Sequence, residues 1–444
     1  MPAGRSKYTR LKTISDLVWK ASPQPIVEAL QDLSPQLDAR KTWLGPGHPY
    51  RGNLTRLLDT PGYTPKIGSL LQYVACSTLL HAFDGWNYIS RAFDSIGMGD
   101  RRTALHLAYY AELRAAMALL ATQGIGVFNL THVSFATKKE AFYVKATTHN
   151  FAWQAFGEWA NQTRGLRGFL HNIHVAGTSL YDWLDKAGAS PVVQNELSAR
   201  WLNAWSIDLG LYEEDRNLRN EVSYRPSSIR QPADPPIHPT EESIEPLLRS
   251  WEAFEPSKMG SADVLDKHLL REALSFAYRI QSLGRPPSGP RFAAYLGRLS
   301  PDASEILQQF LRRETDPQRH FLLNKSADRT KTPTSALPTI ARALLLLRVA
   351  SAATARVFSD AGISTDDISF WWSQRIVDLG LSEDPAHGYD LTELWPEVGA
   401  SIDAIETWRS EAPDPSSRDA CIALGAQVPI SQFQRTALWL LGNA

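Results

Sequence analysis

The chain has 444 residues, of which 43% are hydrophobic and 21% are charged, and its formal net charge is −1. This is the composition of a globular protein, and the length exceeds what one compact core usually serves, so two domains are expected. A nearly neutral chain has no overall attraction for nucleic acid, so any anion site must be built locally from a few side chains.

Residues 1–65 are expected to form a proline-rich N-terminal arm. From position 23 onward its prolines are Pro23, Pro25, Pro35, Pro46, Pro49, Pro61 and Pro65. Because proline disrupts a helix interior, this spacing predicts only short helices, for example over residues 26–33. The arm would either wrap on the body of the protein or form a partly mobile leader.

Two long amphipathic helices are predicted after the arm. Apolar residues recur at helical spacing from Ile67 to Gly97, and again from Asp100 or Thr103 to Gly124. Asp and Thr are good N-terminal caps, and glycine commonly ends a helix. The short link between the two helices predicts an antiparallel hairpin.

Short β-branched and aromatic runs follow between residues 125 and 146. Such runs, separated by polar turns, predict a small β-hairpin inserted into an otherwise helical domain. Further helices are then expected over residues 151–160, 166–174, 179–187 and 191–208.

A dense polar cluster occupies residues 216–226, with the sequence RNLRNEVSYRP. Arginine carries a permanent charge and five donors in a fixed geometry that suits phosphate or carboxylate. Asparagine adds neutral donors and acceptors. Such a cluster at the end of a helix serves either a buried polar network or an anionic ligand.

Within this cluster, Arg219 and Asn220 are followed by three residues and then Tyr224. This pattern resembles the signature of the HEPN superfamily, which comprises small helical-bundle domains of many prokaryotic toxin and anti-phage proteins. The family motif is an arginine, usually followed by a polar residue, with a histidine four to six residues further on. Tyr224 stands at the position of that histidine, and tyrosine titrates near pH 10 rather than near neutrality.

The resemblance implies a HEPN-like domain over residues 66–230 and metal-independent RNA cleavage at a homodimer interface, with no cofactor and no metal. Arg219 would stabilise the charge developing on the scissile phosphate, and Asn220 would orient that phosphate. Tyr224 would donate a hydrogen bond to the phosphate or to the 2′-oxygen nucleophile.

Neighbouring side chains would support this site. Arg216, Asn217 and Arg225 would hold the nucleic acid backbone. His106 and Glu112, on the second predicted helix, would complete the site or belong to a buried network. As an alternative, the arginines of the cluster pair with acidic residues and hold helices together; the candidate partners are Glu112, Glu213, Glu214 and Asp215.

Residues 231–244 form a proline-rich linker, and residues 245–444 are expected to form a second helical domain. Its predicted helices cover residues 245–254, 262–283, 292–299, 302–313, 336–361, 368–379, 389–405 and 432–441, with a basic loop over 325–333. The longest apolar run, residues 336–358, contains three arginines, Arg342, Arg348 and Arg356, which argue against a membrane helix.

The chain lacks the motifs of nucleotide-binding loops, zinc proteases and α/β-hydrolases. Only two cysteines occur, Cys76 and Cys421, too few for a disulfide framework. A cytoplasmic all-α protein is therefore expected, with two helical domains, a small β-hairpin insert in the first, and no membrane partner. It would be a HEPN-like component of a bacterial defence or toxin-type system that binds or cleaves RNA, or else a non-enzymatic helical scaffold or adaptor within a larger complex.

Overall fold

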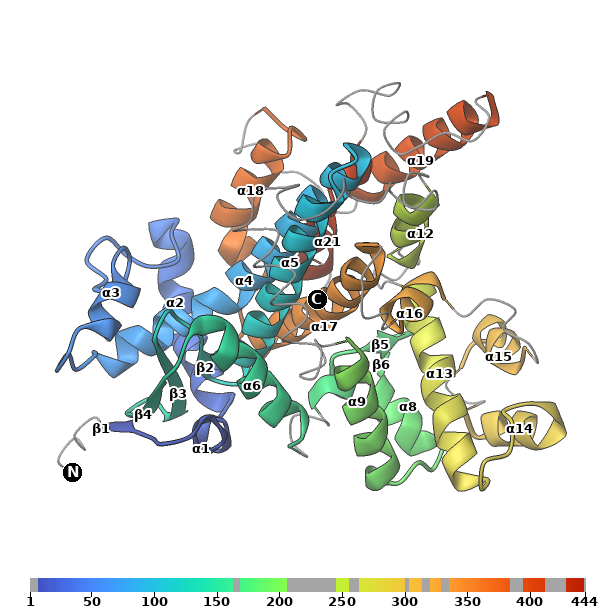
Figure 1. Ribbon diagram of the computed structural model, residues 1–444, viewed down its shortest axis with the longest axis horizontal. Helices are drawn as coiled ribbons and strands as arrows, with labels where there is room; N and C mark the ends of the chain where they lie inside the picture. Colours follow the sequence, from blue (N-terminus) through green and yellow to red (C-terminus); the bar gives the residue numbers. More distant parts are fainter. Residues whose placement is uncertain are drawn as a thin grey trace, which may run out of the picture.

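The computed structural model describes residues 7–162, 168–205, 245–254, 263–299, 303–313, 320–328, 335–383, 394–411 and 429–442. Most of these residues are helical, and the described strands form one sheet of four strands and one of two (Figure 1). Of the predicted all-α class, the mostly helical character of the chain is confirmed.

The two long predicted helices are α4 (Ile67–Gly97) and α5 (Arg101–Thr122), which pack against each other along their length. Asp100 caps α5, and its side chain accepts a hydrogen bond from the Thr103 N–H over 3.0 Å. The link between the helices turns tightly at Gly99, which adopts a positive φ of 78°. Glycine adopts this conformation readily because it has no Cβ. Periodicity and capping residues were thus sufficient to predict this hairpin.

Helix α17 (Leu337–Asp360) runs through the middle of the molecule and packs against both α4 and α5 (Figure 1). The Trp86 indole N–H of α4 donates to the Ser351 hydroxyl of α17 over 3.0 Å, and both side chains are fully buried. By length and composition α17 is apolar enough to cross a membrane, but 94% of its most apolar window is buried inside the protein. It is a core helix.

The N-terminal arm contains more helix than its prolines predict. Its helices are α1 (Ile14–Lys20), α2 (Gln24–Arg40) and α3 (Leu54–Asp59). The expectation of only short helices is wrong for α2, which has 17 residues and contains Pro35 in its interior. Leu30, Leu33 and Leu37 are all buried, and α2 packs against α4, so tertiary burial outweighs the cost of the proline.

The strands are β1 (Lys7–Arg10), β2 (Ile125–Gly126), β3 (Thr131–Thr137) and β4 (Glu140–Lys145), in the order β1-β4-β3-β2. Strands β3 and β4 pair antiparallel, with an irregularity between Phe135 and Thr137. Strand β1, from the N-terminal arm, pairs parallel with β4. Sequence analysis did not predict β1, because a strand of four residues at a sheet edge has no distinctive pattern.

The remaining described elements follow the predicted series closely. They are α6 (Thr148–Ala160), β5 (His174–Val175), β6 (Thr178–Ser179), α8 (Leu180–Lys186), α9 (Pro191–Trp205), α12 (Glu245–Ala253), α13 (Asp263–Gln281), α14 (Gly289–Leu296), α15 (Glu305–Arg312), α16 (Phe321–Ser326), α18 (Ser369–Asp378), α19 (Leu394–Glu411) and α21 (Gln434–Gly442). Two of the predicted elements differ from the structure. The helix predicted over 166–174 gives way to strand β5 at His174, and the loop predicted from 325 begins within α16.

The buried apolar residues form one continuous core that runs from the N-terminal arm to α21. Helix α17, which follows the predicted linker in sequence, contributes to the same core as α4 and α5. The linker itself, residues 231–244, lies outside the described residues, so the division into two domains stays a prediction.

Candidate functional site

The arginine–asparagine cluster that carries the family resemblance lies outside the described residues. Its members are Arg216, Asn217, Arg219, Asn220, Tyr224 and Arg225. Their roles remain predictions. The two supporting residues on α5, His106 and Glu112, are described.

Glu112 is fully buried and forms an ion pair with Arg342 of α17. The Arg342 Nε donates to Glu112 Oε1 over 2.8 Å, and another guanidinium nitrogen donates to the Thr339 hydroxyl over 3.2 Å. Arg342 is itself only 5% exposed. A buried charge requires such a partner, so this pair joins α5 to α17 in the core.

His106 lies elsewhere on α5, half-buried, with its ring edge against Tyr110 at a centroid distance of 4.8 Å. One turn further along, the Arg114 guanidinium donates to His81 Nδ1 over 2.8 Å and lies 3.5 Å from Asp84. Burial, and then the Arg114 charge, lower the pKa of His81 to about 3, so its ring is neutral and accepts this bond. Glu112 and Arg114 of α5 therefore each form a polar contact with another helix, α17 and α4 respectively.

Helices α9 and α13 lie side by side (Figure 1). A cleft between them is lined by three arginines. We call it the α9–α13 cleft; its volume is about 370 Å³. It is lined by Leu197, Arg200, Trp201, His268, Arg271, Glu272, Ser275, Phe276, Arg279, Pro286, Pro287 and Ser288. The α13 members are spaced by three or four residues, so they occupy a single face of that helix.

The lining of this cleft is basic. Arg200, Arg271 and Arg279 contribute three positive charges, and Glu272 is the single carboxylate among the lining residues. Arg200 and Arg279 are exposed, whereas Arg271 is 8% exposed and donates to the backbone carbonyl of Arg313. One anchored guanidinium beside two exposed ones is an arrangement suited to an anion.

Aromatic rings form part of the same wall. The Arg200 guanidinium lies over the Phe276 ring, 5.6 Å from its centroid. Trp201 stacks on Trp205 with a centroid distance of 5.1 Å and an interplanar angle of 19°. Arginine and aromatic side chains occur together in sites that bind single-stranded nucleic acid. Trp201 is only 5% exposed, so the half-buried Phe276 is the more exposed ring of this wall.

Sequence analysis missed this cleft. Its arginines come from α9 and α13, which are separated in sequence by residues 206–262, so no local motif joins them. The signal that was present is the spacing of His268, Arg271, Ser275 and Arg279 along a single helix face.

Two other basic side chains, Lys138 and Arg313, also have partners. Lys138 pairs with Asp32 over 2.8 Å, which joins the β3–β4 turn to α2. The Arg313 guanidinium lies over the Phe310 ring, 5.3 Å from its centroid. The backbone carbonyl of Arg313 accepts a hydrogen bond from Arg271, which lines the α9–α13 cleft.

Comparison with known proteins identifies no relative of this chain. No protein-family model matches it, and neither a curated protein nor a solved structure matches it.

Proposed function

We propose that the protein binds RNA as a HEPN-like component of a bacterial defence or toxin-type system. The observation that supports this most directly is the α9–α13 cleft, where Arg200, Arg271 and Arg279 face a cavity whose walls include Phe276 and Trp201. The overall charge of the chain is near neutral, so this local concentration of guanidinium groups is where a polyanion would bind.

The ligand that fits this cleft is single-stranded RNA. Its unstacked bases are free to stack on aromatic rings, while its phosphates accept hydrogen bonds from arginine. Double-stranded nucleic acid has no free base faces and would use only the charges. We therefore expect the cleft to favour an unpaired segment over a duplex.

Cleavage, if the protein carries it out, would involve the 216–225 cluster. Arg219 would stabilise the negative charge on the phosphate as the 2′-oxygen attacks, and Asn220 would orient that phosphate. Tyr224 would donate a hydrogen bond to the phosphate or to the 2′-oxygen. This part of the proposal rests on the resemblance of the motif, as does the expectation of a homodimer.

A binding measurement tests the RNA proposal. Fluorescence anisotropy of a labelled single-stranded RNA would be recorded with the full chain and with the double variant Arg200→Ala/Arg279→Ala. We expect the double variant to bind at least about tenfold more weakly, and wild-type affinity to fall between about 50 mM and about 200 mM salt. Arg356→Ala, which removes an exposed arginine of α17, is the matched control and should bind like wild type.

Equal affinity of the double variant and of wild type would contradict the proposed role of the cleft. Cleavage is tested separately by incubating RNA in a chelator with wild type and with Arg219→Ala. Products formed by wild type alone would support catalysis by the cluster. Intact RNA in both samples, at concentrations where RNA binds, would reject an isolated nuclease and leave RNA binding in place.

The second candidate function is a non-enzymatic scaffold or adaptor. It is favoured by Glu112, for which two roles were expected, support of a catalytic site or membership of a buried network, and which forms a buried pair with Arg342. Size-exclusion chromatography with light scattering after removal of RNA distinguishes the two. A scaffold would bind protein partners equally well with the Arg200→Ala/Arg279→Ala substitutions.

A further inference from the structure

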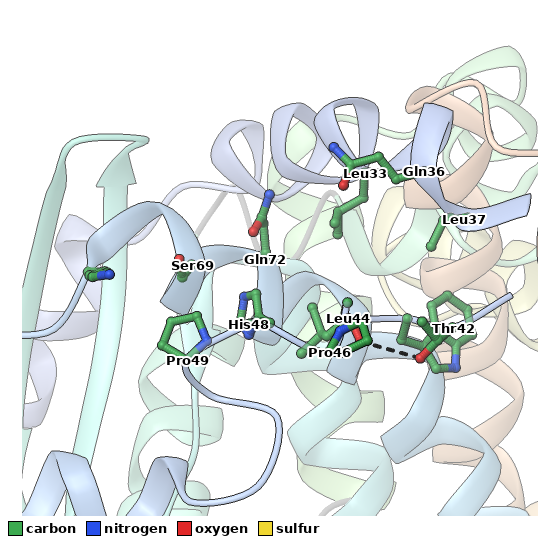
Figure 2. Close-up of a pocket in the computed structure, with 14 residues that line it drawn as sticks. Leu33, Gln36, Leu37, Thr42, Leu44, Pro46, His48, Pro49, Ser69 and Gln72 are labelled. Atoms are coloured by element: carbon green, nitrogen blue, oxygen red, sulfur yellow. Dashed lines mark hydrogen bonds between the residues drawn. The ribbon is translucent and has the colours of Figure 1, made fainter. Parts of the chain in front are cut away.

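The cavity between α2 and α4 has a volume of about 580 Å³, and polar groups on its lining are engaged with their neighbours (Figure 2). His48 is directed toward Ser69 and Gln72. The Thr42 hydroxyl donates to the Leu44 carbonyl over 3.3 Å. These contacts hold the loop over residues 42–49 and do not specify a ligand. The edge of the four-stranded sheet presents a more specific arrangement of polar groups.

Strand β1 lies at one edge of this sheet. The strand order is β1-β4-β3-β2, so among the described strands β1 has one neighbour, β4. Figure 1 shows β1 at the margin of the molecule. Lys7, Thr9 and Arg10 are exposed, and Tyr8 is half-buried. An edge of this kind can pair with a further strand.

Half of the backbone groups of β1 face away from β4. The Lys7 N–H donates to the Lys139 carbonyl over 2.9 Å, and the Leu11 N–H donates to the Tyr143 carbonyl over 2.8 Å. Alternate residues of a strand bond to the same neighbour, so residues 7, 9 and 11 direct their backbone groups toward β4. The N–H and C=O groups of residues 8 and 10 are therefore directed toward the open side.

The conformation of β1 is fixed by its contacts with β4. The Tyr8 ring stacks on the Tyr143 ring with a centroid distance of 4.5 Å and an interplanar angle of 13°. All four residues of β1 are in register with β4. An edge that is extended before a partner arrives loses little conformational entropy when a strand is added to it.

The open edge is positively charged. Lys7, Arg10 and Lys12 are exposed, and none of them forms an ion pair with a described carboxylate, although Glu140 is the cross-strand neighbour of Lys7. Lys139, which is also exposed, lies next to Lys7 through its backbone carbonyl. Charge complementarity therefore favours a partner that carries carboxylates.

A second copy of β1 does not complement this edge. Symmetric antiparallel pairing of two β1 strands would place Lys7 of one copy opposite Arg10 of the other, and like charges directly opposite each other are destabilising. Charged side chains on edge strands discourage such self-pairing. Because Lys7 and Arg10 are three residues apart, they lie on opposite faces of the strand. The complementary strand carries two carboxylates at the same spacing, one on each face.

We propose that the open edge of β1 binds an acidic, extended segment of a partner protein by strand addition. The backbone groups of residues 8 and 10 would exchange hydrogen bonds with the added strand, and its carboxylates would pair with Lys7 and Arg10. Main-chain bonds would supply affinity, and the charges would select the partner. This surface is separate from the α9–α13 cleft and does not depend on RNA binding.

Fluorescence anisotropy of the full chain tests the charge requirement with two labelled peptides, TEVTEV and TKVTKV. We expect the glutamate peptide to bind, and the lysine peptide to bind at least about tenfold more weakly. The double variant Lys7→Ala/Arg10→Ala should weaken binding of the glutamate peptide about threefold to tenfold. Arg356→Ala, at an exposed position of α17, is the matched control and should bind like wild type.

A pair of variants at one position tests the backbone requirement. Arg10→Ala and Arg10→Pro both remove the cation, but only proline removes the outward N–H, and edge strands tolerate proline at such a position. We expect Arg10→Pro to bind the glutamate peptide about threefold to tenfold more weakly than Arg10→Ala. Hydrogen exchange of the wild-type chain, measured by mass spectrometry, should show slower exchange in residues 7–11 when the glutamate peptide is bound.

The proposal is overturned if TEVTEV does not bind, if both peptides bind equally well, or if bound peptide leaves hydrogen exchange in residues 7–11 unchanged. Equal affinity of Arg10→Ala and Arg10→Pro would likewise reject strand addition. Loss of affinity for single-stranded RNA in Lys7→Ala/Arg10→Ala, without peptide binding to wild type, would assign this edge to nucleic acid instead.

Discussion

Arg342 of α17 and Arg200 of α9 carry the same chemical group in opposite settings. Arg342 is 5% exposed and paired with a fully buried carboxylate, whereas Arg200 is exposed at the rim of a cavity with an aromatic ring beneath it. The first arginine holds two helices together, and the second is placed to contact a ligand. The difference shows that arginine content alone does not locate an anion site; the position of the nearest carboxylate does.

Arg348 is a second buried arginine of helix α17. It lies on α17 six residues after Arg342, is 5% exposed, and donates to Asp266 of α13 over 2.8 Å. Helix α17 is therefore joined by buried ion pairs to α5 and to α13. A buried pair is costly to break, because removal of one partner leaves the other charge without compensation.

The largest effect is expected for Arg342→Met. We predict a loss of about 3–5 kcal/mol in the free energy of unfolding, since Glu112 would remain buried without its cation. Denaturant titration measures this loss. The double variant Glu112→Leu/Arg342→Met should recover part of it, and Arg356→Met, on the same helix but exposed, should change stability by less than about 0.5 kcal/mol. Equal losses for Arg342→Met and Arg356→Met would remove the distinction between interior and surface arginines.

The next effect is expected from acid, which should destabilise the folded protein by protonating the buried His132. His132 is fully buried; its Nδ1 accepts from the Phe128 N–H over 3.1 Å, so it is the Nε2–H that donates to the Ala146 carbonyl over 3.0 Å. Burial lowers its pKa from 6.5 to about 4. The unfolded chain therefore binds this proton more readily than the folded one, and the stabilisation is complete above pH 6.5 and is lost as the pH falls toward about 4.

Unfolding measured across this range should show stability decreasing below pH 6.5, and the imidazole resonances of His132 should titrate near pH 4 in NMR. His132→Leu should lower stability at pH 7 and show a shallower decrease with acid. A His132 resonance that titrates near 6.5 would contradict this account of the β3–β4 region.

A smaller effect is expected for Trp86→Phe, which removes the donor to Ser351 and leaves that hydroxyl buried without it. We predict a loss of about 1–3 kcal/mol in the free energy of unfolding. Trp19→Phe is the matched control, because Trp19 is 65% exposed and its replacement should cost less than about 0.5 kcal/mol. Similar losses for the two variants would indicate that the α4–α17 contact contributes little.

The smallest effect on stability is expected in the cleft. Arg200→Ala and Arg279→Ala should each change the free energy of unfolding by less than about 0.5 kcal/mol, because exposed side chains contribute little to stability. Thermal unfolding of the variants checks this before any binding measurement. A loss of more than about 2 kcal/mol would place these arginines with Arg342, as structural residues.

Much of the helical fold was predictable, since α4, α5, α13 and α17 show long apolar periodicity, and Asp100 caps α5. The exceptions have physical causes. Helix α2 continues through Pro35 because its leucines are buried against α4, and β1 forms because the edge of β4 is available to it. Neither partner is visible in the local sequence.

The candidate sites were less predictable. The α9–α13 cleft assembles residues from two helices that are distant in sequence, so no local motif marks it. The family resemblance pointed instead to Arg219 and its neighbours, whose roles stay predictions.

The sequence by itself determined that the protein is mostly helical, because the spacing of apolar residues fixes which helix faces become buried. Tertiary structure alone decided which arginines face carboxylates and which face a cavity. A guanidinium group acts according to its nearest partner, and for Arg342, Arg348 and Arg200 that partner lies on a different helix.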